Sequence, residues 1–337
     1  MIPGKHPARR LPRLGLITAL ALVVSMSLSA FYTTRLNPEM RHFVGTHRIK
    51  QAWAEKMTRE HGSKVVVYGG SSCEFSIDGE RLLQRHHLPC ANLGRGAGMG
   101  AVVLTMAALD EVKEGDTLVI ALEPALLTEP LDFPNQGIQF SVASGNPHWI
   151  RQPLPTVNPV SRVGILAALR PGALHAFTLL AKVLRGQPLY RYRLENMRPS
   201  GFNVTPLRLD IQGPPGHGVQ VSESARRFLL ALRDWCGQHK VRLAYSIPWG
   251  YTPSDGLEFT RRINAEFLLQ IAQIIPVLKD PALGGHEIRE DFSDTAWHLT
   301  PEAAARRTDQ FASQLKEWRI WTVEQLRDLA AVNRVPP

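Results

Sequence analysis

Cysteine is scarce in this sequence, which has only three in 337 residues: Cys73, Cys90 and Cys236. No two of them form a C-x-x-C pair, and their spacing fits no metal site. Cys73 and Cys90 follow two expected neighbouring strands, so they can form a bridge in an oxidising compartment. The odd count and the helical position of Cys236 favour three buried thiols instead. No metal and no other cofactor is expected.

The sequence also lacks a basic block interleaved with aromatic residues, which argues against a nucleic-acid partner. Its formal net charge is +9, with part of it in the first thirteen residues and the rest in small clusters such as 191–198. An anionic membrane surface or an acidic polymer could attract this charge, but a plain solvated surface is favoured over both. Apolar residues make up 44% and charged residues 20%, which is typical of a globular protein.

Nucleotide-binding motifs are absent as well. The glycine run Gly94–Gly100 lies between an expected strand and an expected helix. A G-x-G-x-x-G pattern starting at Gly94 would need glycine at Met99, and one starting at Gly96 would need it at Ala101. No Gly-Lys-Ser/Thr follows. What remains is a set of backbone N–H groups near a helix N-terminus that can hold an anion or a developing oxyanion. The alternative is an ordinary tight turn.

A long uncharged apolar run, Leu14–Tyr32, follows the basic N-terminus and is long enough to span a bilayer. Positive residues before it predict a cytoplasmic N-terminus, with the rest of the chain crossing the membrane. The small residues at 27–30 would suit a signal cleavage site, but the length of the run favours an uncleaved anchor. We therefore expect residues 1–34 to hold a single-pass protein in the inner (cytoplasmic) membrane, with its domain periplasmic or otherwise extracytoplasmic.

Strands alternate with helices along most of the chain, which predicts an α/β fold: a doubly wound, flavodoxin-like, mostly parallel five-stranded sheet with helices on both faces. The expected strands are 65–69, 87–92, 117–122, 241–247 and 275–278, and the expected helices are 79–86, 101–112, 223–238, 257–273, 301–318 and 322–332.

Four parts follow from this pattern. Residues 1–34 are the tail and anchor, 35–62 are a helical stalk, 63–123 with 217–337 form the α/β domain, and 124–216 are an insertion or cap rich in Pro and Gly. The apolar helices of the cap are expected to pack on the core rather than to lie on a membrane surface.

The chain is organised around one turn. Val65–Tyr68 is a β-branched and aromatic run suited to a buried strand, and Gly69 and Gly70 then break it. Ser71 and Ser72 follow at the carboxyl end of this strand, where sites form in open α/β sheets. Such a serine is either a nucleophile or an ordinary capping residue.

A second candidate lies near the C-terminus. His298 stands just before a helix that Thr300 caps and Pro301 opens, and Asp294 precedes it by four residues. A histidine with a carboxylate partner has the parts of a general base and its orienting group. The alternative is a turn residue and a surface histidine.

These blocks together resemble the SGNH (GDSL-like) hydrolase superfamily, and in particular its membrane-anchored branch of exopolysaccharide O-acetylation and teichoic-acid D-alanylation proteins. The matching residues are Gly70-Ser71-Ser72, the turn at Asn92-Leu-Gly94, and the late Asp294…His298-Leu-Thr-Pro. The resemblance implies that Ser72 is the nucleophile, His298 the base and Asp294 its partner. It further implies that the N–H of Ser72 and that of Gly94 or Gly96 hold the oxyanion.

The sequence departs from that family at three points. Asp294 and His298 are one residue further apart than in Asp-x-x-His, and Ser71 replaces the Asp of the first block. The third block should supply an oxyanion asparagine in Gly-x-Asn-Asp, but this chain has Ala121-Leu-Glu123-Pro124 there. An ionised Glu123 cannot donate a hydrogen bond. These departures argue against catalytic activity more than against the fold.

The resemblance implies a serine esterase or O-acyltransferase that acts on an envelope or secreted polysaccharide, an acylated glycan being its substrate. A membrane protein that donates the acyl group is a further expected partner. The competing hypothesis is a catalytically inactive SGNH-like protein that binds glycan or helps to assemble an envelope or exopolysaccharide complex.

Overall fold

The computed structural model describes residues 10–170, 173–204, 211 and 216–331. Within this part the protein is an α/β structure with a four-stranded parallel sheet in the order β2-β1-β3-β4. The strands are β1 (Val65–Gly69), β2 (Cys90–Asn92), β3 (Thr117–Ala121) and β4 (Arg242–Tyr245). In place of the fifth strand expected at 275–278, the structure has a single isolated parallel bridge between Tyr245 and Val277. A separate pair, β5 (Gly250–Tyr251) and β6 (Gly285–His286), forms a two-stranded sheet.

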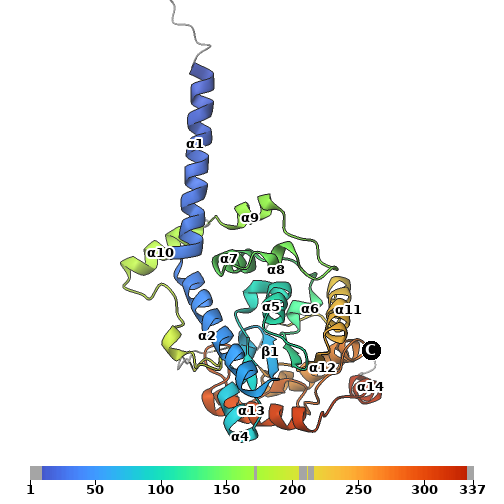
Figure 1. The fold of residues 1–337 in the computed structure, drawn as a ribbon. Coiled ribbons are helices and arrows are strands. Elements are labelled where there is room, and N and C mark those ends of the chain that lie inside the picture. Colours follow the sequence, from blue (N-terminus) through green and yellow to red (C-terminus); the bar gives the residue numbers. More distant parts are fainter. Residues whose placement is uncertain (1–9, 171–172, 205–210, 212–215, 332–337) are drawn as a thin grey trace, which may run out of the picture.

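Helices account for most of the remaining chain (Figure 1). The longer ones are α1 (Arg10–Phe31), α2 (Pro38–His61), α5 (Gly100–Leu109), α10 (Ala173–Leu184), α11 (Glu223–Gln238), α12 (Leu257–Ala272) and α13 (Pro301–Lys316). The shorter ones are α3 (Ser71–Glu74), α4 (Gly79–His86), α6 (Ala125–Thr128), α7 (Asn135–Ala143), α8 (His148–Arg151), α9 (Arg162–Ala168) and α14 (Val323–Ala331), with single turns at η2 (Tyr32–Leu36), η3 (Ala97–Met99), η4 (Leu194–Asn196), η5 (Ser254–Gly256) and η6 (Arg289–Asp291).

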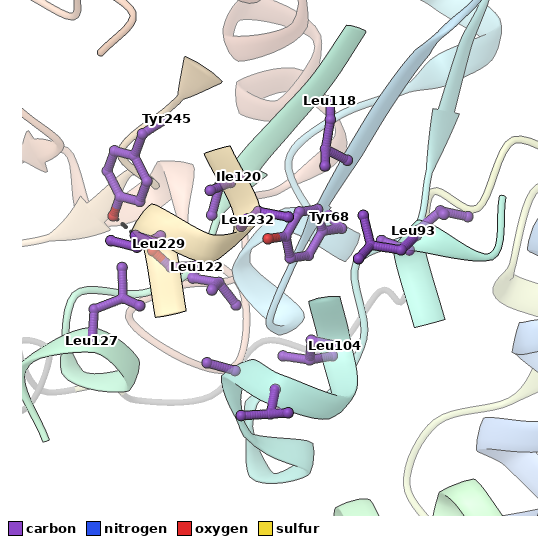
Figure 2. Close-up of a cluster of buried hydrophobic side chains, with 14 of the residues drawn as sticks. Tyr68, Leu93, Leu104, Leu118, Ile120, Leu122, Leu127, Leu229, Leu232 and Tyr245 are labelled. Carbon is purple, nitrogen blue, oxygen red and sulfur yellow. Dashed lines mark hydrogen bonds between the residues drawn. The ribbon is translucent and has the colours of Figure 1, made fainter. Parts of the chain in front are cut away.

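Alternate residues of the sheet face two hydrophobic clusters, as the pleat of a strand requires. On one face, side chains of β1, β3 and β4 pack against α5 and α11; Figure 2 shows Tyr68, Ile120 and Tyr245 among them. The Tyr245 hydroxyl satisfies its polar end by donating to the carbonyl oxygen of Leu122 at 2.7 Å. On the other face, Val67 and Val119 belong to the cluster that includes Phe311 of α13. Helices thus cover both faces of the sheet.

Capping residues in the sequence correctly predict where two of the helices begin. The side chain of Ser222 accepts a hydrogen bond from the backbone of Ala225 and caps α11, as predicted. Thr300 caps α13 in the same way, with Pro301 in the first turn. The strand β1 and helix α4 also have the predicted bounds. All three cysteines are free and buried, as favoured from the sequence.

Helix α1 projects alone from the body of the molecule (Figure 1). By length and composition, the stretch Leu14–Leu36 is able to cross a membrane, and none of its most apolar window is buried within the protein. Its placement agrees with the predicted apolar run.

The expected stalk at 35–62 is a helix but does not stand apart from the domain. Nine residues of α2 are buried, and Met40 and Trp53 belong to the main core. The Trp53 indole donates to the carbonyl oxygen of Cys90 in β2 at 2.8 Å. Lys50 is fully buried and its ammonium group bonds to Glu74. Helix α2 is therefore a layer of the α/β domain, because its apolar stripe packs against the edge strand β2.

The cap segment divides into two parts. Helices α7 and α8 pack on the core, to which they contribute Phe140 and Trp149. Helices α9 and α10 instead leave large apolar side chains exposed, among them Val163 and Phe177. The prediction that the apolar helices of the cap pack on the core is therefore confirmed only in part: α9 contributes Ala168 to the core, with Ile165 packed against it, whereas no described residue of α10 belongs to it. Both helices lie on the side of the body from which α1 emerges (Figure 1).

Candidate active site

The turn after β1 is built by two glycines that no other residue could replace without movement. A Cβ on Gly69 would collide with the carbonyl oxygen of Ala121 in the neighbouring strand β3. A Cβ on Gly70 would collide with the carboxylate of Glu123. The chain can therefore pass close to the end of β3 and begin α3 at Ser71. Ser72 lies in this first turn and is fully buried.

The carboxylate of Glu123 fills the space in front of this turn. Its Oε2 accepts the backbone N–H of Gly70 at 3.2 Å, and its Oε1 accepts that of Ser72 at 3.1 Å. Burial raises the pKa of Glu123, while the nearby Ser72 groups and the charged form of His298 act in the opposite direction without cancelling the shift. Two convergent N–H groups on one acidic group are the geometry of an anion-binding turn.

The Ser72 hydroxyl is closed in. Its Oγ has no hydrogen-bond partner in the described part of the chain. Ser72 lines a cavity of about 10 Å³ together with Ser246, Arg307 and Phe311. A volume of this size is comparable with that needed by a single water molecule. In this conformation no room exists there for an acyl group.

Asp294 and His298 form the predicted pair. The loop that carries them is closed by an antiparallel bridge between Phe292 and Leu299 and by a bond from the Ser293 N–H to the His298 carbonyl oxygen at 2.8 Å. This closure brings Asp294 Oδ1 within 2.7 Å of His298 Nδ1. Both side chains are buried, and the remaining ring nitrogen, Nε2, makes no hydrogen bond to a described residue.

Tyr192 holds the carboxylate of Asp294 in place. Its hydroxyl donates to Asp294 Oδ2 at 2.8 Å, and Arg191 lies 3.4 Å from the same oxygen. Burial alone would raise the pKa of Asp294, but the hydrogen bonds from His298 and Tyr192 outweigh it and lower the value to about 2. Asp294 is therefore ionised at neutral pH and can orient the imidazole.

The pair and the serine turn occupy the same region without being bonded. The His298 ring stacks on Phe75, with 4.0 Å between ring centroids and 9° between planes. Phe75 follows Ser72 by three residues and directly follows α3. No hydrogen bond joins Ser72 Oγ to His298. The structure thus joins Asp294 to His298 and brings them beside α3, but it does not complete a Ser-His-Asp chain.

The glycines predicted to hold an oxyanion have other roles. The N–H of Gly94 is already bonded to its own neighbour Asn92, at 2.9 Å from Oδ1. Gly94 also packs so tightly beneath α3 that a Cβ would collide with the backbone nitrogen of Glu74. Gly96 lies against the ring of Phe43. The two N–H groups that converge on the Glu123 carboxylate belong to Ser72 and to Gly70. The resemblance nominates the first as an oxyanion donor; Gly70 directly precedes the serine pair and could have been nominated on that ground.

Two further side chains enter the site from distant parts of the sequence. Tyr192 comes from the cap segment and lies 102 residues before Asp294, a relation that no local signal reveals. Arg307 of α13 is fully buried beside Ser72, and it donates to Ser246 Oγ at 2.6 Å and to the Ile247 carbonyl oxygen at 3.2 Å. It forms no ion pair with a described residue; its hydrogen bonds go to neutral groups, and the Asp280 carboxylate nearby favours its charged form against the effect of burial.

The site therefore consists of an Asp294–His298 pair beside a serine turn whose two N–H groups hold the Glu123 carboxylate. Within the described ranges, no three His, Cys, Asp or Glu side chains come together as a metal site would need. Comparison of the chain with protein-family models, with curated proteins and with solved structures found no match. A function for this chain is therefore inferred from its residues and their geometry.

Proposed function

We propose that the protein is a membrane-anchored, extracytoplasmic SGNH-like serine esterase or O-acyltransferase acting on an envelope or secreted polysaccharide. The observation that carries the proposal is the Asp294–His298 pair, bonded at 2.7 Å and held beside the helix that presents Ser72. An ionised carboxylate on Nδ1 leaves Nε2 to take a proton, which is what a base for a serine needs.

The topology supports the superfamily assignment. The sheet order β2-β1-β3-β4, with Val277 bridging to the outer edge of β4, corresponds to the flavodoxin-like order 2-1-3-4-5. In such doubly wound sheets the ligand binds at the carboxyl ends of the strands. Ser72 follows the carboxyl end of β1, and Glu123 follows that of β3.

The proposed reaction runs in two steps. Ser72 Oγ attacks the acyl carbonyl while His298 Nε2 takes the hydroxyl proton, and the negative oxygen is held by the N–H groups of Gly70 and Ser72. The bond to the leaving alcohol breaks, and the imidazolium returns the proton to that alcohol. Water, or a sugar hydroxyl, then attacks the acyl carbonyl while His298 Nε2 takes its proton; the bond to Ser72 Oγ breaks, and the imidazolium returns the proton to that oxygen. Glu123 has to leave the two N–H groups before the first step can begin.

The substrate class rests on the resemblance and on the predicted location. A single apolar N-terminal helix with basic residues before it supports a domain outside the cytoplasm, where envelope and secreted polysaccharides lie. A membrane protein that supplies the acyl group fits an anchored transferase better than a free esterase. The topology is tested by fusing a reporter that is active only outside the cytoplasm after Gly62; activity of a cytoplasmic reporter alone would refute it.

A second function is favoured by one specific observation. Glu123 occupies both N–H groups, and the Ser72 hydroxyl faces a cavity too small for a substrate. A catalytically inactive SGNH-like protein that binds glycan, or that helps to assemble an envelope complex, would need neither a free oxyanion site nor an accessible serine. In that case the Asp294–His298 pair would serve to hold the cap through Tyr192.

One assay separates the two. The full-length protein in detergent is incubated with p-nitrophenyl acetate as the wild type and as the variants Ser72→Ala, His298→Ala and Glu123→Ala. The proposed enzyme loses activity in the first two variants and gains it in the third, because removal of the carboxylate frees both N–H groups. Equal rates in all four proteins would exclude the enzyme and support the binding protein.

A further inference from the structure

Exposed apolar side chains gather on one segment of the cap. Apart from α1 and η2, eleven large hydrophobic residues are strongly exposed in the described part of the chain, and eight of these lie between residues 163 and 194. The most exposed are Leu184 at 78%, Val163 at 76% and Phe177 at 70%. Single exposed apolar residues are normal, but a concentration of this kind marks a contact surface.

The spacing of these residues gives each helix an apolar stripe. On α10, Phe177, Leu180 and Leu184 are three and four residues apart and so share one face. On α9, Val163 and Leu166 are three apart. The stripes face away from the core, to which α9 contributes Ala168 alone among its fully buried residues. Two short amphipathic helices thus present their apolar faces outward.

The corner between α9 and α10 is tied to the end of the membrane-crossing stretch. The carbonyl oxygen of Leu169 accepts hydrogen bonds from Ser29 Oγ at 3.3 Å and from Thr33 Oγ1 at 3.0 Å. The stretch Leu14–Leu36 ends three residues after Thr33 and seven after Ser29. At the rise of an α-helix the corner lies roughly 5–10 Å inside that end. This is the depth, about 5–10 Å, at which interfacial helices bury their apolar faces.

The arrangement of the helices agrees with this depth. In Figure 1, α9 and α10 lie on the side of the body from which α1 emerges, and α10 runs across the base of α1 rather than along it. A helix lying crosswise at this level has its axis near the plane of the membrane. Its apolar face then meets acyl chains while its ends stay among the headgroups.

A group of arginines lies directly below the same level. A groove of about 840 Å³ is lined by Arg35, Arg41, Arg48 and Arg193, and Thr34 at the end of the apolar stretch also lines it. The side chains of these four arginines form no hydrogen bond or ion pair with a described residue, and Glu195 is the only carboxylate among the described residues of the lining. Unpaired arginines near a bilayer are attracted to anionic headgroups, by about 1 kcal/mol each close to the surface.

We propose that α9 and α10 are a second membrane contact, lying in the interface with their apolar stripes in the edge of the acyl region and the groove arginines facing the headgroups. The occupant of this surface is the lipid bilayer that α1 crosses. The domain then contacts the membrane at two places, α1 and the α9–α10 surface, instead of being attached through α1 alone. Tyr192, which lines the groove and bonds to Asp294, lies on the side of the site that faces the bilayer.

The test measures depth in the full-length protein. The three native cysteines are buried, so a spin label can be attached to single cysteines introduced by Phe177→Cys, Leu180→Cys and, as a matched control, Phe259→Cys on α12. Phe259 is 58% exposed and apolar, but it lies outside the cap. The protein is placed in nanodiscs, one copy per disc, and collisions of each label with oxygen and with a water-soluble nickel complex are recorded.

The labels on α10 are expected to collide with oxygen and to be protected from the nickel complex, while the label at Phe259 shows the opposite. Equal exposure of all three labels to the nickel complex would overturn the proposal. Dipolar broadening between α10 labels of two copies in detergent, together with nickel exposure in single-copy discs, would assign the surface to self-association and would equally overturn it.

A second measurement tests the arginines. In discs of phosphatidylcholine with added phosphatidylglycerol, the α10 labels are expected to move deeper than in discs of phosphatidylcholine alone. The variant Arg41→Gln/Arg48→Gln/Arg193→Gln is expected to lose this difference while keeping the protection of α10 from nickel. If the depth of the α10 labels in the wild type does not change with phosphatidylglycerol, the arginines do not contact the headgroups. That result would contradict the proposal.

Discussion

The backbone N–H of Ser72 donates to the carboxylate of Glu123 at 3.1 Å, and the N–H of Gly70 donates to the other oxygen of the same group at 3.2 Å. The protein thereby holds its own acidic group where the proposed reaction would place a substrate oxyanion. The contact shows that the turn is pre-arranged to receive negative charge, because both donors already point to one acceptor. It also means that any acyl chemistry at Ser72 competes with Glu123.

The buried carboxylate makes folding stability depend on pH. Because burial raises the pKa of Glu123 above its ordinary value of 4.5, the folded protein holds a proton that the unfolded chain releases. The stability linked to this proton is fully present below pH 4.5 and is lost as the pH rises through the folded pKa. In Glu123→Gln, we expect this part of the pH dependence to disappear, as measured by urea unfolding between about pH 4 and 8.

The exposed Glu129, which lies six residues further on, serves as the control. The Glu129→Gln variant is expected to keep the wild-type profile. A Glu123→Gln profile parallel to that of the wild type over the whole range would show that the folded and unfolded pKa values of Glu123 are the same, contrary to its burial.

The steric contact between Gly70 and Glu123 can be measured with a double-mutant cycle. A Cβ on Gly70 collides with the carboxylate oxygens, so Gly70→Ala should destabilise the wild type and displace Glu123 from the two N–H groups. In the Glu123→Ala background the colliding atoms are absent, and Gly70→Ala should cost less by about 0.5–3 kcal/mol, the range seen for residues in contact. The free energy of unfolding of the four proteins gives this coupling. Additive effects of the two substitutions would place the carboxylate away from Gly70.

Tyr192 should control the ionisation of Asp294. Its hydroxyl is one of the groups that lower the pKa of Asp294 to about 2, from an ordinary value of 3.8. The stability gained from this depressed pKa is present above pH 3.8 and is lost as the pH falls through the folded pKa. Tyr192→Phe is expected to reduce stability at neutral pH by about 1.5–3 kcal/mol, because the lost hydrogen bond goes to a charged group. The difference from the wild type should shrink as the pH falls from about 4 to 2.

Tyr190 offers a matched control for this substitution. It packs against Phe43 and Tyr192, but its hydroxyl forms no hydrogen bond to a described residue. Tyr190→Phe should leave both the stability at neutral pH and its acid dependence close to those of the wild type. If the two variants behave alike, the Tyr192–Asp294 hydrogen bond has no energetic role.

Local signals were sufficient for parts of the fold and of the site. The β1 strand, the glycines after it, and the Thr300 and Pro301 start of α13 depend on neighbouring residues, and all have the predicted form. The hydrogen bond between Asp294 and His298 is expected for the same reason, because only three residues of one closed loop separate them. Geometry set within a few residues can be inferred from residue types.

Contacts between distant segments could not be inferred in this way. Glu123 reaches the Ser72 turn only because β1 and β3 are neighbours in register, with Gly69 opposite Ala121. The burial of α2 depends on Trp53 reaching Cys90 of the edge strand, whereas the pattern of residues 35–62 alone predicts a helical stalk. The exposure of α9 and α10 depends on where the cap meets α1. In each case the residue that makes the contact lies many positions away in the sequence. The residue pattern of one segment alone is compatible with burial and with exposure.

The buried lysine of α2 should be important for holding this helix on the domain. Lys50 is fully buried, and its Nζ bonds to Glu74 Oε2 at 3.2 Å, to the Gly201 carbonyl oxygen at 2.9 Å and to the Gly94 carbonyl oxygen. Lys50→Met leaves a buried carboxylate and two carbonyl oxygens without this donor. Removal of one partner from a buried ion pair costs about 3–5 kcal/mol, and we expect a loss of this size in the free energy of unfolding.

Two further variants show whether the charge or the packing of Lys50 accounts for that loss. Lys50→Met/Glu74→Gln removes both charges and should recover a large part of the stability, because the neutral amide can still bond to Asn203, which donates to Glu74 at 2.9 Å in the wild type. Arg59→Met changes an exposed cation of the same helix and should alter the stability by less than about 0.5 kcal/mol. If Lys50→Met were as harmless as Arg59→Met, α2 would be held by its apolar stripe alone.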